Sequence, residues 1–125
     1  MNSYFDTVYT PAGAWLPEML MAALAQAATD HADDLGIGHD AMLTLSGCLW
    51  MLVRSRISMR ELPAPGEPVA VRTWLRRPTP VMSVRDYEFF RGGRSIGYGL
   101  QYWVLVDEKK RSITGLRDVP LLWTL

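Results

Sequence analysis

The segment Ala14–Leu35, with the sequence AWLPEMLMAALAQAATDHADDL, is the only stretch that is long and periodic enough to form a substantial helix. Pro17 suits the first helical turn, where its missing N–H costs no hydrogen bond. Glu18 follows beside the positive end of the helix dipole, and Gly36 supplies the residue type that most often ends a helix. The segment therefore predicts one long helix that stops at Leu35.

Apolar residues cover most of this predicted helix. One buried stripe follows the i, i+4, i+7 spacing of a helix packed on a core, and its members are Leu16, Leu20, Ala23, Leu24, Ala27 and His31. Most of the remaining surface is apolar too, through Met19, Met21, Ala22, Ala25 and Ala28. Gln26 is the lone polar residue of this part and is expected to have buried partners. We expect protein to wrap the helix on several sides.

The rest of the chain predicts strands. A first strand at Ser3–Tyr9 precedes the helix, and the turn Thr10-Pro11-Ala12-Gly13 joins the two. After one helical turn near residues 39–45, alternating runs predict strands at residues 49–57, 69–76, 82–91, 95–107 and 112–115. The apolar tail at residues 119–125 is expected to pack back on the domain. This element order predicts an α+β hotdog fold, in which about five to six antiparallel strands curve around one helix.

Alternation also predicts which side chains share a face of the sheet. In the strand at residues 49–57, we expect Leu49, Met51, Val53 and Ile57 on one face and the arginines on the other. In the strand at residues 95–107, one side should carry Ile96, Tyr98, Leu100, Tyr102, Val104 and Val106.

Length and composition fit a single domain over residues 1–125 that buries a core without disulfides or metal. Cys48 is the only cysteine, which indicates a reducing compartment. The first residues lack the basic and apolar regions of a signal peptide, and no run reaches the roughly 18–20 apolar residues of a transmembrane helix. We expect a soluble, cytoplasmic protein without a membrane partner.

The formal net charge is zero, but the charges are unevenly placed. Residues 1–47 contain six acids and no Lys or Arg, whereas residues 48–125 contain all 13 basic residues, 11 of them Arg, against seven acids. A basic sheet surface could meet an acidic carrier protein or the phosphates of coenzyme A. The alternative is a solvated face with cross-strand ion pairs. No basic helix, Cys/His finger or aromatic RNA-binding strand motif indicates a nucleic-acid partner.

Five segments in order resemble the acyl-carrier-protein (ACP) thioesterases. They are Trp50–Met59, Pro65-Gly66-Glu67, Val71–Trp74, Arg85-Asp86-Tyr87-Glu88, and Trp103–Asp107 followed by Arg111. Upstream, Gln26-Ala-Ala, His31-Ala and Leu35-Gly36 resemble the helix of the first hotdog in that family. The family usually has two hotdogs in one chain, and this sequence resembles the first. The resemblance implies at least a homodimer, or a dimer of dimers, because one hotdog sheet usually completes itself by pairing with another copy.

The family's catalytic signature, Asp-x-Asn-x-His, lies before the helix of the second hotdog. At the equivalent place this sequence has Thr10, Ala12 and Ala14. The short acyl-CoA thioesterases carry Asp-Pro-Ala-Gly at this turn, where this sequence has Thr10-Pro11-Ala12-Gly13. The usual acid is therefore replaced in both comparisons.

Thioester hydrolysis also needs hydrogen-bond donors for the developing oxyanion, and backbone amides at a helix start can supply them. We expect Gly13, Ala14 and Trp15 to form this oxyanion and substrate-binding element. The candidate catalytic residues are Thr10 to position a water, Glu18 as a base, and Gln26 to orient a water. Each has a structural alternative: Thr10 bonds the turn, Glu18 complements the helix dipole, and Gln26 bonds across a dimer seam.

His31 and His39, with Asp30, Asp34 and Asp40, invite a metal or acid–base interpretation. Their spacing matches no recognised metal site, so we expect no metal and instead a solvated helix end whose acids pair with the arginines of the sheet. A hotdog dehydratase would need a histidine beside the turn at residues 10–13, and both histidines are far from it in sequence.

The sequence thus predicts an acyl-thioester hydrolase that acts on acyl-ACP or acyl-CoA substrates without a cofactor. The acyl chain would lie beside the Met- and Ala-rich helix. The alternative is a non-catalytic hotdog module that binds acyl thioesters, or an inert subunit of a larger assembly.

Overall fold

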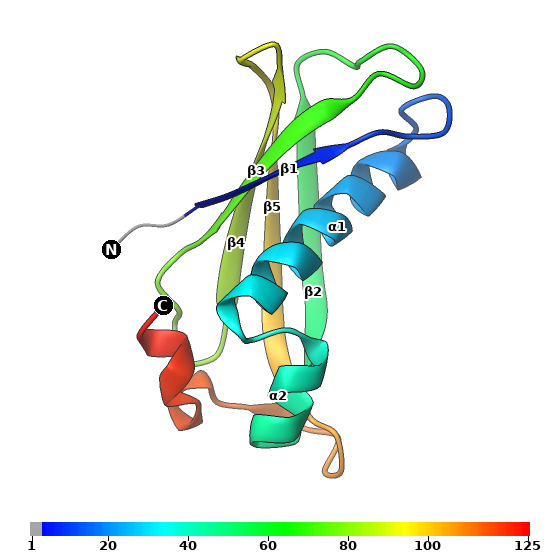
Figure 1. Cartoon of the computed structure of the whole chain (residues 1–125). Helices are drawn as coiled ribbons and strands as arrows, with labels where there is room; N and C mark the ends of the chain where they lie inside the picture. The colour runs from blue at the N-terminus through cyan, green and yellow to red at the C-terminus, as the bar shows by residue number, and fades with distance from the viewer. Residues whose placement is uncertain (1–3) are drawn as a thin grey trace.

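The computed structural model describes residues 4–125 as one curved antiparallel sheet with a long helix across its inner face (Figure 1). The elements in order are β1 (Tyr4–Tyr9), α1 (Pro17–Leu35), α2 (His39–Ser46), β2 (Cys48–Met59), β3 (Val69–Leu75), β4 (Ser83–Arg91), β5 (Arg94–Asp107) and β6 (Ile113–Thr114), followed by the 3-10 turns η1 (Leu116–Asp118) and η2 (Pro120–Trp123). The strand order is β1-β3-β4-β5-β2, and β6 also pairs with β5. The α+β hotdog fold predicted from the element order is confirmed.

Two apolar clusters hold the layers together. In the first, Leu24 and Ala27 of α1 pack on side chains of β3, β4 and β5. Gly99 on β5 allows this close approach, because a Cβ there would lie 3.2 Å from Tyr87 Cβ and 3.3 Å from Leu24 Cδ1. The second cluster joins α2, the start of β2 and the C-terminal turns, and it consists of Ile37, Met42, Cys48, Leu105, Leu116, Val119 and Leu122. The prediction that the tail packs back is therefore correct.

Helix α1 buries one face rather than several. Its buried residues are Leu20, Ala23, Leu24, Ala27, Ala28 and His31, which differ from the predicted stripe by the addition of Ala28 and the loss of Leu16. Leu16 is 51% exposed, because it is the N-cap, where the backbone is still extended. Ala25 and Gln26 are exposed, so the prediction of a helix wrapped on several sides is wrong for the residues that the structure describes.

A β-bulge overturns the predicted faces of β2. Leu52 pairs with Trp103 and Arg54 pairs with Tyr102, so Val53 is the extra residue. One inserted residue moves every later side chain to the other face. Leu49 and Met51 therefore share the outer face with the arginines, whereas Ile57 packs against the core under α1.

A second bulge, opposite Phe89 and Phe90, leaves Ile96 on β5 without a partner in the register. Ile96 is fully buried in the cluster under α1, so it does not share the side of Tyr98 and Leu100 as the alternation predicts. Two other predicted bounds also change. The helical turn near residues 39–45 is the eight-residue helix α2, and Ser3, the predicted start of the first strand, lies outside the described residues.

Four arginines of the sheet form ion pairs in the described part of the chain: Arg72 with Asp6, Arg76 with Asp86, Arg91 with Glu61 and Glu67, and Arg94 with Glu61. These contacts favour the alternative of a solvated face with cross-strand pairs. The acids at the end of α1 form none of the ion pairs found within residues 4–125, so the prediction that they pair with sheet arginines is wrong there. Asp30 instead accepts from Gln26.

Candidate functional site

The turn between β1 and α1 is fixed by the loop at residues 61–67. The Gly66 amide donates to the Gly13 carbonyl at 2.8 Å, and Trp15 Nε1 donates to the Glu67 carbonyl at 3.0 Å. Trp15 is only 4% exposed and packs edge-on against Tyr9. The residues that lead into α1 therefore have a defined backbone conformation although they belong to no regular element.

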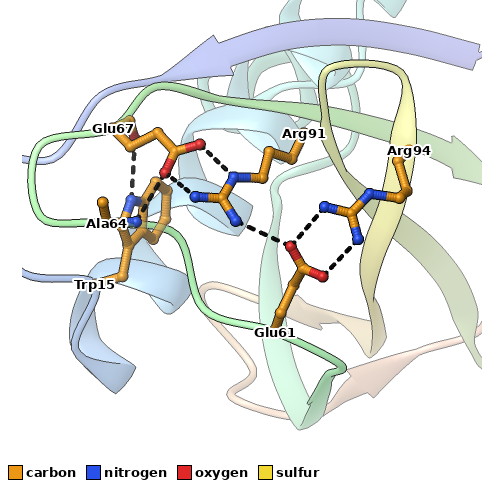
Figure 2. Close-up of polar contacts among 6 residues, drawn as sticks. All are labelled: Trp15, Glu61, Ala64, Glu67, Arg91 and Arg94. Carbon is orange, nitrogen blue, oxygen red and sulfur yellow. Dashed lines mark hydrogen bonds and ion pairs between the residues drawn. The ribbon is translucent and has the colours of Figure 1, made fainter.

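A ladder of ion pairs holds the 61–67 loop in place (Figure 2). The Glu67 carboxylate accepts two hydrogen bonds of 2.6 Å from the Arg91 guanidinium and one of 2.8 Å from the Ala64 amide. Arg91 also donates a hydrogen bond to Glu61 at 2.9 Å, and Glu61 accepts one hydrogen bond from each terminal nitrogen of Arg94. Bidentate pairing fixes the angle as well as the distance between the two groups. The hairpin of β4 and β5 thereby positions the start of α1.

This ladder should make the site sensitive to acid. Hydrogen bonds from Arg94 and Arg91 lower the pKa of Glu61, and those from Arg91 and the Ala64 amide lower the pKa of Glu67. A lowered pKa in the folded state adds stability that is complete above the ordinary value of 4.5 and is lost as the pH falls through the lowered pKa. We expect the urea midpoint of the wild type to exceed that of Arg91→Met by a constant amount at pH values well above the ordinary carboxyl pKa of 4.5, and the difference to shrink as the pH falls below it. A difference that does not depend on pH would contradict this origin.

Several backbone amides at the start of α1 have no hydrogen-bond partner in the described part of the chain. The amides of Gly13, Ala14, Trp15 and Glu18 donate to no residue in the range 4–125. The N-cap Leu16 has no side-chain cap, and its carbonyl accepts from the Met19 and Leu20 amides. Unpaired amides at the positive end of a 19-residue helix attract negative charge. This end of the helix therefore carries unpaired donors, and the oxyanion role of Gly13, Ala14 and Trp15 stays a prediction.

The predicted catalytic side chains are not brought together. Thr10 and Glu18 are exposed on either side of the turn, and neither forms a side-chain hydrogen bond or ion pair with the described residues. Gln26 lies eight residues after Glu18, about 12 Å further along the helix. It is exposed in this chain and donates a hydrogen bond to Asp30 at 2.9 Å, so no residue of the described chain supplies the buried partner expected for Gln26. Among these three, Glu18 is the carboxylate that lies at the helix start.

Sequence reasoning missed the residues that hold the site. Glu67 and Arg91 are 24 positions apart, and no periodic pattern links them. The signal for Glu67 was the motif Pro65-Gly66-Glu67, which was used only for the family resemblance. Arg91 lies just before the hairpin glycines and had no signal of its own.

Neither histidine lies at the start of α1, and the two have different surroundings. His31 is buried, and its Nδ1 accepts from Arg85 Nη1 at 2.8 Å. Burial, helped by the charge of Arg85, lowers the pKa of His31 to about 4, so this imidazole is neutral at pH 7. His39 is exposed at the start of α2. Within residues 4–125, no three His, Cys, Asp or Glu side chains lie close enough to hold a metal ion.

Comparison with known proteins agrees with this fold and this turn. The family model of the acyl-ACP thioesterase N-terminal domain matches residues 12–119. This chain belongs to that family. No curated protein sequence matches this acyl-ACP thioesterase N-terminal domain.

Solved structures similar to this N-terminal domain include chains of comparable length and chains about twice as long. An acyl-ACP thioesterase from Bacteroides thetaiotaomicron aligns over 90% of the chain with a TM-score of 0.79 and 24% identity, but only over 49% of its own length. A Lactobacillus plantarum protein assigned as an oleoyl thioesterase aligns over 98% of the chain with a TM-score of 0.84 and 20% identity, and over 50% of its own length. A DHNA-CoA thioesterase from Staphylococcus aureus aligns over 94% of the chain and 84% of its own length, with a TM-score of 0.80 and 20% identity.

This N-terminal domain therefore spans about half the length of the two longer proteins. In the part of the chain that the structure describes, no helix is long and apolar enough to cross a membrane.

Proposed function

We propose that this chain is an acyl-thioester hydrolase module that acts on acyl-ACP or acyl-CoA at the start of α1. The observation that carries the proposal is the set of unpaired amides at Gly13, Ala14, Trp15 and Glu18, held in position by the 61–67 loop. Such donors stabilise the negative charge that develops on the carbonyl oxygen in acyl transfer. The family to which the chain belongs supports the same substrate class.

The base in this proposal is Glu18. It lies in the first turn of α1, beside the amides, and within residues 4–125 it is free of ion pairs. A carboxylate there can take a proton from a water that attacks the thioester, with the coenzyme or carrier thiol leaving. Thr10, exposed on the other side of the turn, is proposed to position that water, and Gln26 lies too far along the helix to join this step.

We also propose that a second copy completes the site. Strand β2 is at the edge of the sheet and pairs only with β5 among the described strands. It exposes Met51 and Val53, which are 53% and 57% exposed. A long apolar edge strand is a template for pairing with another chain. The two longer relatives extend well beyond the part that this domain matches, and we propose that a homodimer or a dimer of dimers supplies the equivalent of that part.

The deciding experiment measures thiol release by the purified protein from acyl-CoA and acyl-ACP substrates of increasing chain length. Saturable turnover is the expected result, and the preferred length reports the size of the acyl site. No release above background, together with binding of the same thioesters, would favour the non-catalytic module. The specific observation behind that second candidate is that Thr10 occupies the place of the usual acid.

Replacing Glu18 separates the base from the oxyanion donors. We expect Glu18→Gln to lower kcat by about 10²–10⁴-fold with little change in KM, because general bases typically contribute this much. Asp30→Asn removes the same charge from the other end of α1 and should leave turnover unchanged. If Glu18→Gln has the kcat of the wild type, Glu18 is not the base.

A further inference from the structure

The second half of α1 covers a cavity that the proposed hydrolytic site does not use. Its volume is about 460 Å³, and residues of α1, α2, β2, β3, β4 and β5 line it. Ala28 of α1 lines this cavity. It comes ten residues after Glu18, so the cavity lies about 15 Å further along the helix than the proposed base. The wall is largely apolar, through Ala28, Ala32, Ile37, Trp50, Leu75 and Trp103. A volume of this size is within the range of small-molecule sites, about 300–1,000 Å³.

One charged side chain lies in this wall without an acidic partner. Arg85 is only 4% exposed, and its Nη1 donates to His31 Nδ1 at 2.8 Å and to Thr73 Oγ1 at 3.1 Å. Its Nε and Nη2 donate to no residue from 4 to 125, and no carboxylate of this part of the chain lies within ion-pair distance. Both nitrogens keep some contact with open space, because Trp103 Nε1 is the only fully buried side-chain nitrogen or oxygen without a partner in the described chain.

The neighbouring groups leave this charge uncompensated. Asp86 is the next residue, but strand alternation places it on the outer face, where it pairs with Arg76. His31 is neutral at pH 7, so it accepts from Arg85 without cancelling its charge. A guanidinium stays protonated in proteins, and an unpaired charge in a buried place is costly. An anion from outside the chain would remove that cost.

From these observations we infer that the cavity is a binding site for a small carboxylate on an apolar chain or ring, with the carboxylate on Arg85 Nε and Nη2. Arginine binds a carboxylate with two parallel hydrogen bonds, and these are two adjacent donors. The apolar wall accommodates the rest of the ligand. Asp33 and Asp40, both exposed, line the same cavity and repel small inorganic anions, which have no apolar part to offset the repulsion.

The first test compares decanoate with 1-decanol on the wild-type protein, because the two probes share a chain length and differ in charge. Trp50 and Trp103 line the cavity, so tryptophan fluorescence reports binding. We expect decanoate to bind at least about tenfold more tightly than decanol, and inorganic phosphate not to bind. Equal affinity of the acid and the alcohol would overturn the proposal.

Variants of Arg85 then test whether this residue causes the preference for decanoate over decanol. Arg85→Met should bring decanoate to the affinity of decanol. Arg85→Lys should keep only part of the preference, because an ammonium supplies the charge but not the two parallel hydrogen bonds. Arg56→Met removes an exposed arginine from the outer face of β2 and is the matched control, which should bind as the wild type does. If Arg85→Met does not fold, Arg85→Lys and the wild-type comparison still decide. A preference for decanoate that survives in Arg85→Met would overturn the assignment.

The carboxylate has two chemical sources, a free acid or the far end of a dicarboxylic acyl thioester. A preference for sebacoyl-CoA over decanoyl-CoA that Arg85→Met abolishes identifies the far end of an acyl group. Binding of decanoate without that preference identifies a free acid. The site does not depend on the hydrolytic proposal, since decanoate binding is measured without turnover.

Discussion

Replacing Trp15 by Ala should lower the free energy of unfolding by about 3–5 kcal/mol, as for other buried large aromatics, and should abolish thioester turnover. Trp15 is buried against Tyr9, and its Nε1 is one of two hydrogen-bonding links between the 61–67 loop and the start of α1. Its loss leaves a cavity beneath the amides of the proposed oxyanion site. Urea unfolding and thiol release measure the two effects.

Two further variants separate packing from the hydrogen bond. Trp15→Phe keeps most of the apolar volume and should cost about 1 kcal/mol for the lost bond to the Glu67 carbonyl. Trp123→Ala is the matched control, because Trp123 also donates from Nε1 to a carbonyl, that of Leu116, but belongs to the far C-terminal turn. Turnover in Trp123→Ala should equal that of the wild type. Full turnover in Trp15→Ala would show that this turn takes no part in the reaction.

The double variant Met51→Lys, Val53→Lys should convert a dimer into a monomer and reduce turnover by at least about tenfold, one order of magnitude in rate. Charges on an edge strand prevent it from pairing with another strand. Light scattering gives the mass, and thiol release gives the activity.

Leu45→Lys, Val81→Lys is the control for that variant, since both residues are exposed and apolar but lie on α2 and on the loop before β4. This control should stay dimeric and active. If the Met51, Val53 variant keeps the mass of the wild type, the edge of β2 is not the interface.

Periodic patterns predicted the long helix and the strands in their order along the chain, because each of these elements depends on a property of one segment. The faces of β2 could not be predicted, since the bulge at Val53 depends on the register with β5, and nothing within β2 itself marks it. Gln26 was placed in a buried setting because its neighbours are apolar, yet that side of α1 has no protein over it in this chain.

Only the part of the candidate site that depends on one segment could be predicted from the sequence. Amides at a helix start follow from the helix itself, so Gly13, Ala14 and Trp15 could be named from sequence. The ladder of Glu67, Arg91, Glu61 and Arg94 joins residues 24 to 33 positions apart, and such contacts exist only once the strands are paired. Arg85 entered the sequence analysis only as part of the family resemblance, because its isolation from acids is a property of the folded wall of the cavity.

The bulge also determines where the chain can change length. Removing Val53 would join Leu52 directly to Arg54, and the regular register that results still places Leu52 inward, Arg54 outward and Ser55 inward. Removing a residue further along the strand would instead turn the side chains between Val53 and the deletion to the other face. A deletion at Ile57, for example, would turn Arg54 and Arg56 toward α1. Shorter relatives of this domain should therefore have lost their residue here, and an alignment that places the gap elsewhere in β2 assigns the core to the wrong side chains.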